Sequence, residues 1–174
     1  MPRQSAIIIE GVLKESRAKD VKVEVEVDKL HIFSEALHPL PIDPTGRVGA
    51  SIDAHLDARP LNLRNPLTAA IFKIRHTVLQ FIRSSLIEEG FIEVNTSKII
   101  GQAAEGGANL FPFEYFGKKA YLAQSPQLYK EQLTLSLDRV FEVAGYFRAE
   151  KSHTRRHLNE FISVDVEAAF ADEE

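Results

Sequence analysis

Residues 147–167 read FRAEKSHTRRHLNEFISVDVE, and this stretch decides the fold that we predict for the chain. Its second half places Ile162, Val164 and Val166 between polar residues, and a period of two indicates a β-strand with one apolar face. Residues 139–150 alternate in the same way before a polar, basic loop, KSHTRRHLN. Together the two stretches predict an antiparallel hairpin that carries a long basic loop.

Each strand of this hairpin has two faces, because residues two apart in a strand point the same way. Arg148 and Glu150 share one face of the first strand. One face of the second strand carries an aromatic ring, a hydroxyl and two carboxylates: Phe161, Ser163, Asp165 and Glu167. We expect the apolar face to be the core side and this polar face to be open. An open face of this kind is either a binding surface or a solvated sheet face, whose ion pairs contribute about 1 kcal/mol or less each.

The basic loop favours a binding surface. It concentrates cations and hydrogen-bond donors in a chain whose formal net charge is -4: Lys151, His153, Arg155, Arg156 and His157. Groups of this kind beside an open face are suited to holding a triphosphate.

The residues around the hairpin predict helices and short strands. An asparagine–proline pair at residues 65–66 is a typical helix start, and apolar residues then recur at helical spacing until Gly90. A serine–proline pair at residues 125–126 repeats this start before a second helix. Short strands are expected at residues 91–94 and 119–124. We therefore predict an α+β domain built on an antiparallel sheet.

The N-terminal region predicts a separate element. Residues 6–13 and 21–34 indicate a half-buried antiparallel hairpin, in which valines alternate with charged residues. A hairpin is marginally stable alone, so this one is expected to need further strands. The prolines between residues 37 and 66 predict an extended linker or a boundary between domains.

Composition excludes several classes of protein. The chain has no cysteine, which rules out disulfides and thiolate metal sites. It has no apolar run of about 20 residues and no signal peptide, so we expect a cytoplasmic protein that does not enter a membrane. Its net charge of -4 argues against indiscriminate coating of nucleic acid.

Several motifs resemble one enzyme family. Residues 147–167 resemble the second signature motif of the class II aminoacyl-tRNA synthetases. EGGANLF at residues 105–111 and AQSPQLYK at residues 123–130 resemble the aspartate-specific members of archaeal and eukaryotic cytoplasmic type. Asparagine-specific relatives typically lack the lysine of QLYK. Residues 71–97 resemble the first motif, which builds the dimer interface in the family, although Ser97 stands where a proline is usual.

The resemblance implies a domain organisation. Residues 1–36 would be the last strands of an anticodon-binding OB-fold, and residues 37–66 a linker or hinge. Residues 67–174 would be the first half of a class II catalytic domain, with motifs 1 and 2 on an incomplete antiparallel sheet flanked by helices. The third motif and the main Mg²⁺ ligands would lie downstream.

The resemblance also implies that ATP binds at the hairpin. Arg148 would act in catalysis by holding the α-phosphate and the substrate carboxylate while charge develops at phosphorus. Glu150 would accept a hydrogen bond from the adenine amino group, and Phe161 would stack on the adenine. Three loop residues would lie along the ATP, the first two near its phosphates: Arg156, His157 and Leu158.

The amino acid would lie beside the ATP. Glu105 would bind the ammonium group of L-aspartate, and Gln127 and Lys130 would face the substrate from one side of a helix. Lys130 would bind the side-chain carboxylate and so distinguish aspartate from asparagine. Asp165 and Glu167 would contact the ammonium group and, through water, Mg²⁺.

We predict a fragment of an aspartate-specific synthetase, whose parent would be a homodimer. That parent would form aspartyl-adenylate from L-aspartate and ATP and transfer aspartate to tRNA(Asp). The chain alone is expected to be inactive because the third motif is missing. The alternative is a stand-alone, non-catalytic binding or regulatory module. We favour the fragment because unpaired strand edges at both ends of the chain invite aggregation.

Overall fold

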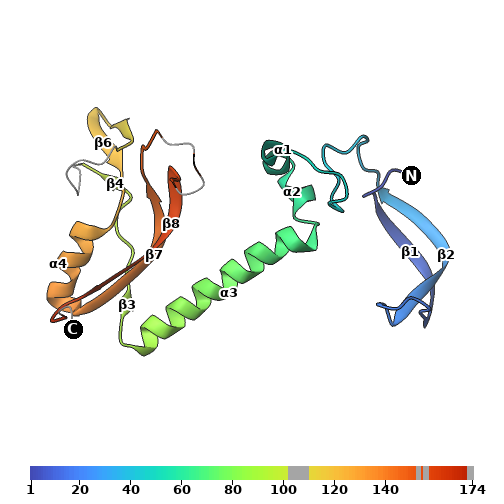
Figure 1. Cartoon of the computed structure of the whole chain (residues 1–174), viewed down its shortest axis with the longest axis horizontal. Helices are drawn as coiled ribbons and strands as arrows, with labels where there is room; N and C mark the ends of the chain where they lie inside the picture. Colours follow the sequence, from blue (N-terminus) through green and yellow to red (C-terminus); the bar gives the residue numbers. More distant parts are fainter. Residues whose placement is uncertain (102–109, 152–153, 155–156, 172–174) are drawn as a thin grey trace. The chain divides into compact units, whose positions relative to one another are not determined.

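The computed structural model describes residues 1–101, 110–151, 154 and 157–171. The chain forms two compact units, Met1–Lys73 and Ile74–Glu174. Helix α3 (Pro66–Glu88) begins in the first unit and continues in the second (Figure 1). Among the described residues, no helix is both long and apolar enough to cross a bilayer.

The first unit begins with the predicted antiparallel hairpin. Strand β1 (Ala6–Glu15) pairs with β2 (Val23–Ser34), and the register shifts between Glu10 and Gly11. A Cβ at Gly11 would lie 2.0 Å from the carbonyl oxygen of Glu26, so only glycine fits at this irregularity. Every residue of both strands is exposed, so the half-burial that the alternation predicts stays a prediction that depends on further strands.

The segment that follows is less extended than its prolines predict. It contains two short helices, α1 (Ile52–Asp57) and α2 (Arg59–Asn62). The Ser51 hydroxyl caps α1 by accepting a hydrogen bond from the backbone N–H of Ala54 at 3.2 Å. Helices of this length give no periodic apolar signal, which is why the sequence did not reveal them.

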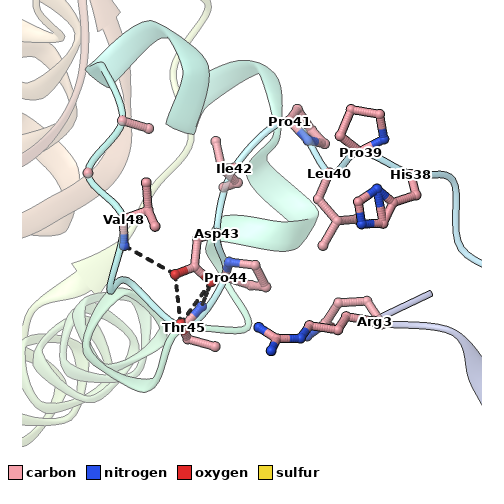
Figure 2. A pocket seen from close by; sticks show the side chains of 13 residues that line it. Arg3, His38, Pro39, Leu40, Pro41, Ile42, Asp43, Pro44, Thr45 and Val48 are labelled. Carbon is pink, nitrogen blue, oxygen red and sulfur yellow. Dashed lines mark hydrogen bonds between the residues drawn. The ribbon is translucent and has the colours of Figure 1, made fainter. Parts of the chain in front are cut away.

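Asp43 organises the turn before α1. Its carboxylate accepts hydrogen bonds from the Thr45 hydroxyl at 2.8 Å and from the backbone N–H of Val48 at 3.1 Å (Figure 2). The hydrogen bonds from Thr45 are the main cause of a lowered pKa for this carboxyl group. The turn lines a pocket of about 350 Å³, which Arg3 and His38 also line.

The second unit is α+β, as predicted. One sheet has the order β3-β7-β8: β3 (Ile92–Glu93), β7 (Arg139–Phe147) and β8 (Glu160–Ala168). The other has the order β4-β6-β5: β4 (Ile99–Ile100), β6 (Lys118–Leu122) and β5 (Pro112–Tyr115). Helix α4 (Gln127–Leu137) joins β6 to β7. The pairs are antiparallel except β3 with β7, which is parallel.

The two sheets meet where β6 and β7 end. The backbone N–H of Phe147 donates to the carbonyl of Ala123 at 3.0 Å, and the N–H of Ala123 donates to the carbonyl of Lys98 at 2.9 Å. A buried apolar cluster lies at this junction: Ile100, Ala123 and Tyr146, with Phe161 packed against it. The junction fixes the end of β7 that leads into the basic loop.

The predicted core side of β8 is wrong. Its apolar residues are partly open to solvent, with exposed fractions of 47% at Ile162, 38% at Val164 and 41% at Val166. The opposite face, with Phe161 and Asp165, is half-buried. β8 is the edge strand of its sheet, and α4 approaches this polar face instead. Alternation identified the two faces correctly but not which of them is covered.

Candidate functional site

A pocket of about 250 Å³ lies where the β7–β8 hairpin opens into its loop. The backbone N–H of Arg148 donates to the carbonyl of Asn159 at 3.0 Å and so extends the strand pairing by one residue beyond β7. The pocket brings together the predicted ATP contacts other than Arg156: Arg148, Glu150, His157, Leu158 and Phe161. Arg156 lies outside the described residues.

The pocket combines a cation with an aromatic ring. The guanidinium carbon of Arg148 lies 5.2 Å from the centre of the Phe161 ring, which is within cation–π range. The hydrogen-bond pattern turns the amide nitrogen of Asn159 toward two carbonyl oxygens, 3.0 Å from that of Arg148 and 2.9 Å from that of Glu150. This arrangement can accept a planar base on the ring and an anionic group on the guanidinium.

Lys130 of α4 reaches the polar face of β8. Its Nζ lies 3.4 Å from Oδ1 of Asp165, 3.4 Å from Oε2 of Glu167 and 3.3 Å from the carbonyl oxygen of Val166. Only 4% of Lys130 is exposed. The structure therefore brings three of the predicted substrate and metal contacts together around one buried ammonium group.

Gln127, another predicted aspartate contact, has a different partner from Lys130. The side-chain nitrogen of Gln127 donates to Oε1 of Glu131 at 2.7 Å, within α4. Gln127 and Lys130 therefore have different partners although they are three residues apart. Glu105 lies outside the described residues.

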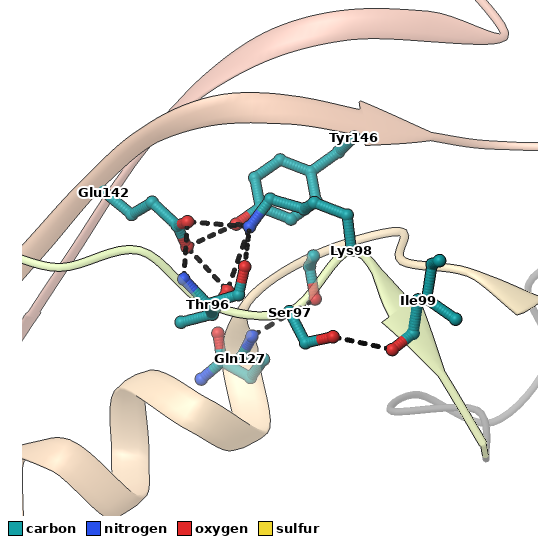
Figure 3. A network of polar contacts seen from close by, with 8 residues as sticks. Thr96, Ser97, Lys98, Ile99, Gln127, Glu142 and Tyr146 are labelled. Atoms are coloured by element: carbon teal, nitrogen blue, oxygen red, sulfur yellow. Dashed lines mark hydrogen bonds and ion pairs between the residues drawn. The ribbon is translucent and has the colours of Figure 1, made fainter.

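A buried carboxylate lies on the polar face of β7 and is held by several neighbouring groups (Figure 3). Glu142 is 1% exposed and accepts hydrogen bonds from the Lys98 ammonium at 2.6 Å and the Tyr146 hydroxyl at 2.6 Å. Thr96 adds its backbone N–H at 2.9 Å and its hydroxyl at 2.7 Å. Burial alone would raise the pKa of Glu142, but the hydrogen bonds from Lys98, Tyr146 and Thr96 outweigh it and lower the pKa.

Tyr146 links this network to the pocket. Its ring faces the Lys98 ammonium at 4.6 Å, and it pairs across the hairpin with Phe161. Residues paired in this way lie on the same face of a sheet. Burial, followed by the hydrogen bond to Glu142, raises the pKa of the Tyr146 hydroxyl, so it remains a donor. The network thus holds the ring of Tyr146 in place, and Phe161 packs against the cluster that contains this ring.

Sequence reasoning missed this network. The available signal was a glutamate in the apolar stretch RVFEVAGYF, because a charge in a buried strand needs partners. Gln124 was also missed: it is 2% exposed, and neither atom of its side-chain amide has a partner among the described residues. Oδ2 of Asp165 is also buried and has no hydrogen-bond partner among the described residues. Buried groups of this kind mark places where a ligand or water belongs.

Comparison with known proteins identifies the family. Residues 51–174 match the family described as tRNA synthetases class II (D, K and N). The chain belongs to this class II synthetase family.

Individual relatives agree with this assignment. The chain is 49% identical over 172 residues to the aspartate–tRNA(Asp) ligase of Pyrococcus horikoshii, covering 98% of the chain and 39% of that protein. It is 50% identical over 175 residues to the aspartate–tRNA(Asp/Asn) ligase of Methanopyrus kandleri, covering 100% of the chain and 41% of that protein. The chain therefore spans about two fifths of the length of these relatives.

A solved synthetase structure shares the fold. The asparaginyl-tRNA synthetase of Pyrococcus horikoshii, complexed with asparaginyl-adenylate, superimposes with a TM-score of 0.84 at 40% identity. The match covers 97% of this chain and 38% of that one. The class II fold that the motifs predicted is therefore confirmed.

The Glu142 network predicts a loss of stability in acid. The pKa of Glu142 in the folded state lies below its ordinary value of 4.5, so the unfolded state takes up the proton first as the pH falls. The stabilisation is complete above the unfolded pKa and is lost as the pH falls through the folded pKa. We expect the free energy of unfolding, measured with urea between about pH 6 and about pH 3.5, to fall more steeply in the unchanged chain than in Glu142→Gln.

Glu114→Gln is the matched control, since Glu114 lies exposed on β5. It should keep the pH dependence of the unchanged chain. An equally steep dependence in Glu142→Gln would show that the buried carboxylate does not stabilise the fold in this way.

Proposed function

We propose that this chain forms the ATP- and aspartate-binding part of an aspartate–tRNA ligase. The ligase would activate L-aspartate with ATP and transfer aspartate to tRNA(Asp). The observation that carries the proposal is the pocket that Arg148, Glu150 and Phe161 line together with two loop residues. The aspartate–tRNA ligases at 49% and 50% identity support the choice of amino acid.

In this proposal the pocket orients ATP for attack at its α-phosphorus. The adenine stacks on Phe161, and its amino group donates to the Glu150 carboxylate. A carboxylate oxygen of aspartate attacks the α-phosphorus, and the bond to the β-phosphate oxygen breaks, so pyrophosphate leaves and aspartyl-adenylate forms. Arg148 lies beside the Phe161 ring and stabilises the charge that develops at the α-phosphate.

Lys130 would select the amino acid. Its contacts to Asp165 and Glu167 are 3.4 Å long, whereas an unstrained charge-assisted hydrogen bond measures about 2.8 Å. The ammonium group can therefore gain from a closer carboxylate, such as the side chain of aspartate. The unpaired Oδ2 of Asp165 would accept a hydrogen bond from the substrate ammonium group, with Glu105 and Gln127 as further contacts.

The described residues do not supply a metal centre. No three His, Asp or Glu side chains among them come together in a way that could hold an ion. Glu167, which the resemblance implies as an indirect Mg²⁺ contact, lies against Lys130.

The proposal extends to the rest of the chain by resemblance. Residues 1–36 would complete an anticodon-binding OB-fold, residues 37–66 would act as a hinge, and residues 67–174 would belong to the catalytic domain. The ligase would work in the cytoplasm as a homodimer. Exposed apolar residues on α3 support the dimer: Leu67, Ile71, Ile74, Val78 and Phe81.

The function is tested in a hybrid ligase, the Pyrococcus horikoshii relative in which this chain replaces the matching segment. We expect the hybrid to catalyse aspartate-dependent exchange between pyrophosphate and ATP, and Arg148→Ala to abolish it. We expect no exchange from the 174-residue chain alone. A folded hybrid with no more exchange than its Arg148→Ala variant would refute the proposal and favour a non-catalytic binding module.

A pair of substitutions in the hybrid tests the two halves of the site. Lys130→Gln removes the charge that faces the substrate side chain, so the KM for aspartate should rise about 10- to 100-fold while the KM for ATP changes little. Phe161→Ala removes the stacking ring, so the KM for ATP should rise about fivefold or more while the KM for aspartate changes little. Each variant is the control for the other. If both raised the two KM values equally, the placement of Lys130 and Phe161 would be wrong.

A further inference from the structure

The turn between β5 and β6 holds an aromatic ring in water. Phe116 is 90% exposed and has a φ of 49°, and Gly117 follows with a φ of 74°. Tyr115 and Lys118 pair across this two-residue turn. Asparagine or glycine is favoured where φ is positive, and a left-handed conformation costs other residues about 1–2 kcal/mol. An exposed phenylalanine in a strained turn indicates a functional role for its ring.

The ring belongs to a row of aromatic side chains along one edge of the hairpin. The ring centres of Phe113 and Tyr115 are 6.4 Å apart, and those of Tyr115 and Phe116 are 4.6 Å apart. Both contacts are edge-to-face. A hollow of about 450 Å³ lies beside the row, and its lining includes Phe113, Glu114, Lys118 and Lys119.

This combination fits unpaired nucleotides. Exposed aromatic rings stack on bases whatever their sequence, and neighbouring lysines bind the phosphates. The chain as a whole has a net charge of -4, whereas the charged residues that line this hollow are Lys118, Lys119 and Glu114. Their local net charge of +1 attracts a polyanion. The same charges would disfavour a purely apolar protein contact at this place.

The position of the hairpin within the second unit suggests which nucleotides it meets. Ala123 comes five residues after Lys118 and accepts the hydrogen bond from Phe147, next to Arg148. At about 3.3 Å per residue, the tip lies about 17 Å along β6 from the strand end that leads to the pocket. A stacked strand rises about 3.4 Å per nucleotide, so about five nucleotides cover that distance.

We propose that the tip of the β5–β6 hairpin binds unpaired nucleotides near the 3′ end of tRNA. Phe116 stacks on a base, and Lys118 and Lys119 contact phosphates. This inference rests on the proposed function, because it requires that the 3′ end of a tRNA enter the neighbouring site.

The test uses the hybrid ligase and a tRNA(Asp) transcript. Phe116→Asn removes the ring but suits the positive φ, so the hairpin keeps its turn. We expect the KM for tRNA(Asp) in aminoacylation to rise about fivefold or more, because the ring no longer stacks on a base. Exchange between pyrophosphate and ATP, which needs no tRNA, should stay within about twofold, since chemistry at the pocket is unaltered.

Phe170→Asn is the matched control. Phe170 is 100% exposed and also has a positive φ of 58°, but it follows β8. It should leave the KM for tRNA(Asp) unchanged. The double substitution of Lys118 and Lys119 by alanine should make tRNA binding less dependent on salt. The slope of log K against log salt concentration should fall by about one for each phosphate contact that is lost.

The outcomes separate this inference from the proposed function. If the hybrid exchanges pyrophosphate but Phe116→Asn matches Phe170→Asn in its KM for tRNA(Asp), the inference fails and the proposed function stands. If Phe116→Asn instead changes the sedimenting mass with that KM unaltered, the tip is a protein contact and the inference is overturned. If a folded hybrid shows no exchange, both are overturned.

Discussion

The hydrogen-bonded carboxylate of Glu142 is the constraint on which the second unit depends. A carboxylate that is 1% exposed would be costly to bury alone, and its charge is stabilised by Lys98, Tyr146 and Thr96. These contacts join the segment before β4 to the centre of β7. Because Tyr146 pairs with Phe161 across the hairpin, the same contacts hold the aromatic wall of the pocket. Replacing one partner would leave a buried charge unsatisfied, so the network specifies one arrangement of the strands.

The polar face of β7 and β8 is covered because its charges find partners there. Lys130 reaches Asp165 and Glu167 from α4, and Lys98 reaches Glu142 from the segment before β4. These contacts involve three carboxylates and two ammonium groups, which leaves a net charge of -1 and one buried oxygen, Oδ2 of Asp165, without a partner among the described residues. Such a face favours a ligand that brings its own cation and donors, as an amino acid does with its ammonium group.

The sequence predicted the parts of this fold that have a strong period. Alternation located the β7–β8 hairpin, and the apolar spacing after residues 65–66 located α3. The alternation of apolar and polar residues in β8 could not reveal which face is covered, because the covered face depends on where α4 and Lys130 lie. Strands β4 and β5 have 2 and 4 residues, too few to show a period. The pocket residues were predicted from their motif, whereas Glu142 and Gln124 needed the structure, since their burial depends on contacts distant in sequence.

In the proposed function, the substrates bind on the polar face of β7 and β8. A crystal structure of the hybrid ligase with a non-hydrolysable analogue of aspartyl-adenylate would test this binding surface. We expect the adenine to stack on Phe161 and the Lys130 ammonium to lie about 3 Å from the aspartate side-chain carboxylate. An analogue bound on the opposite face, against Ile162 and Val164, would show that this binding surface is wrong. So would a bound analogue whose side chain makes no contact with Lys130.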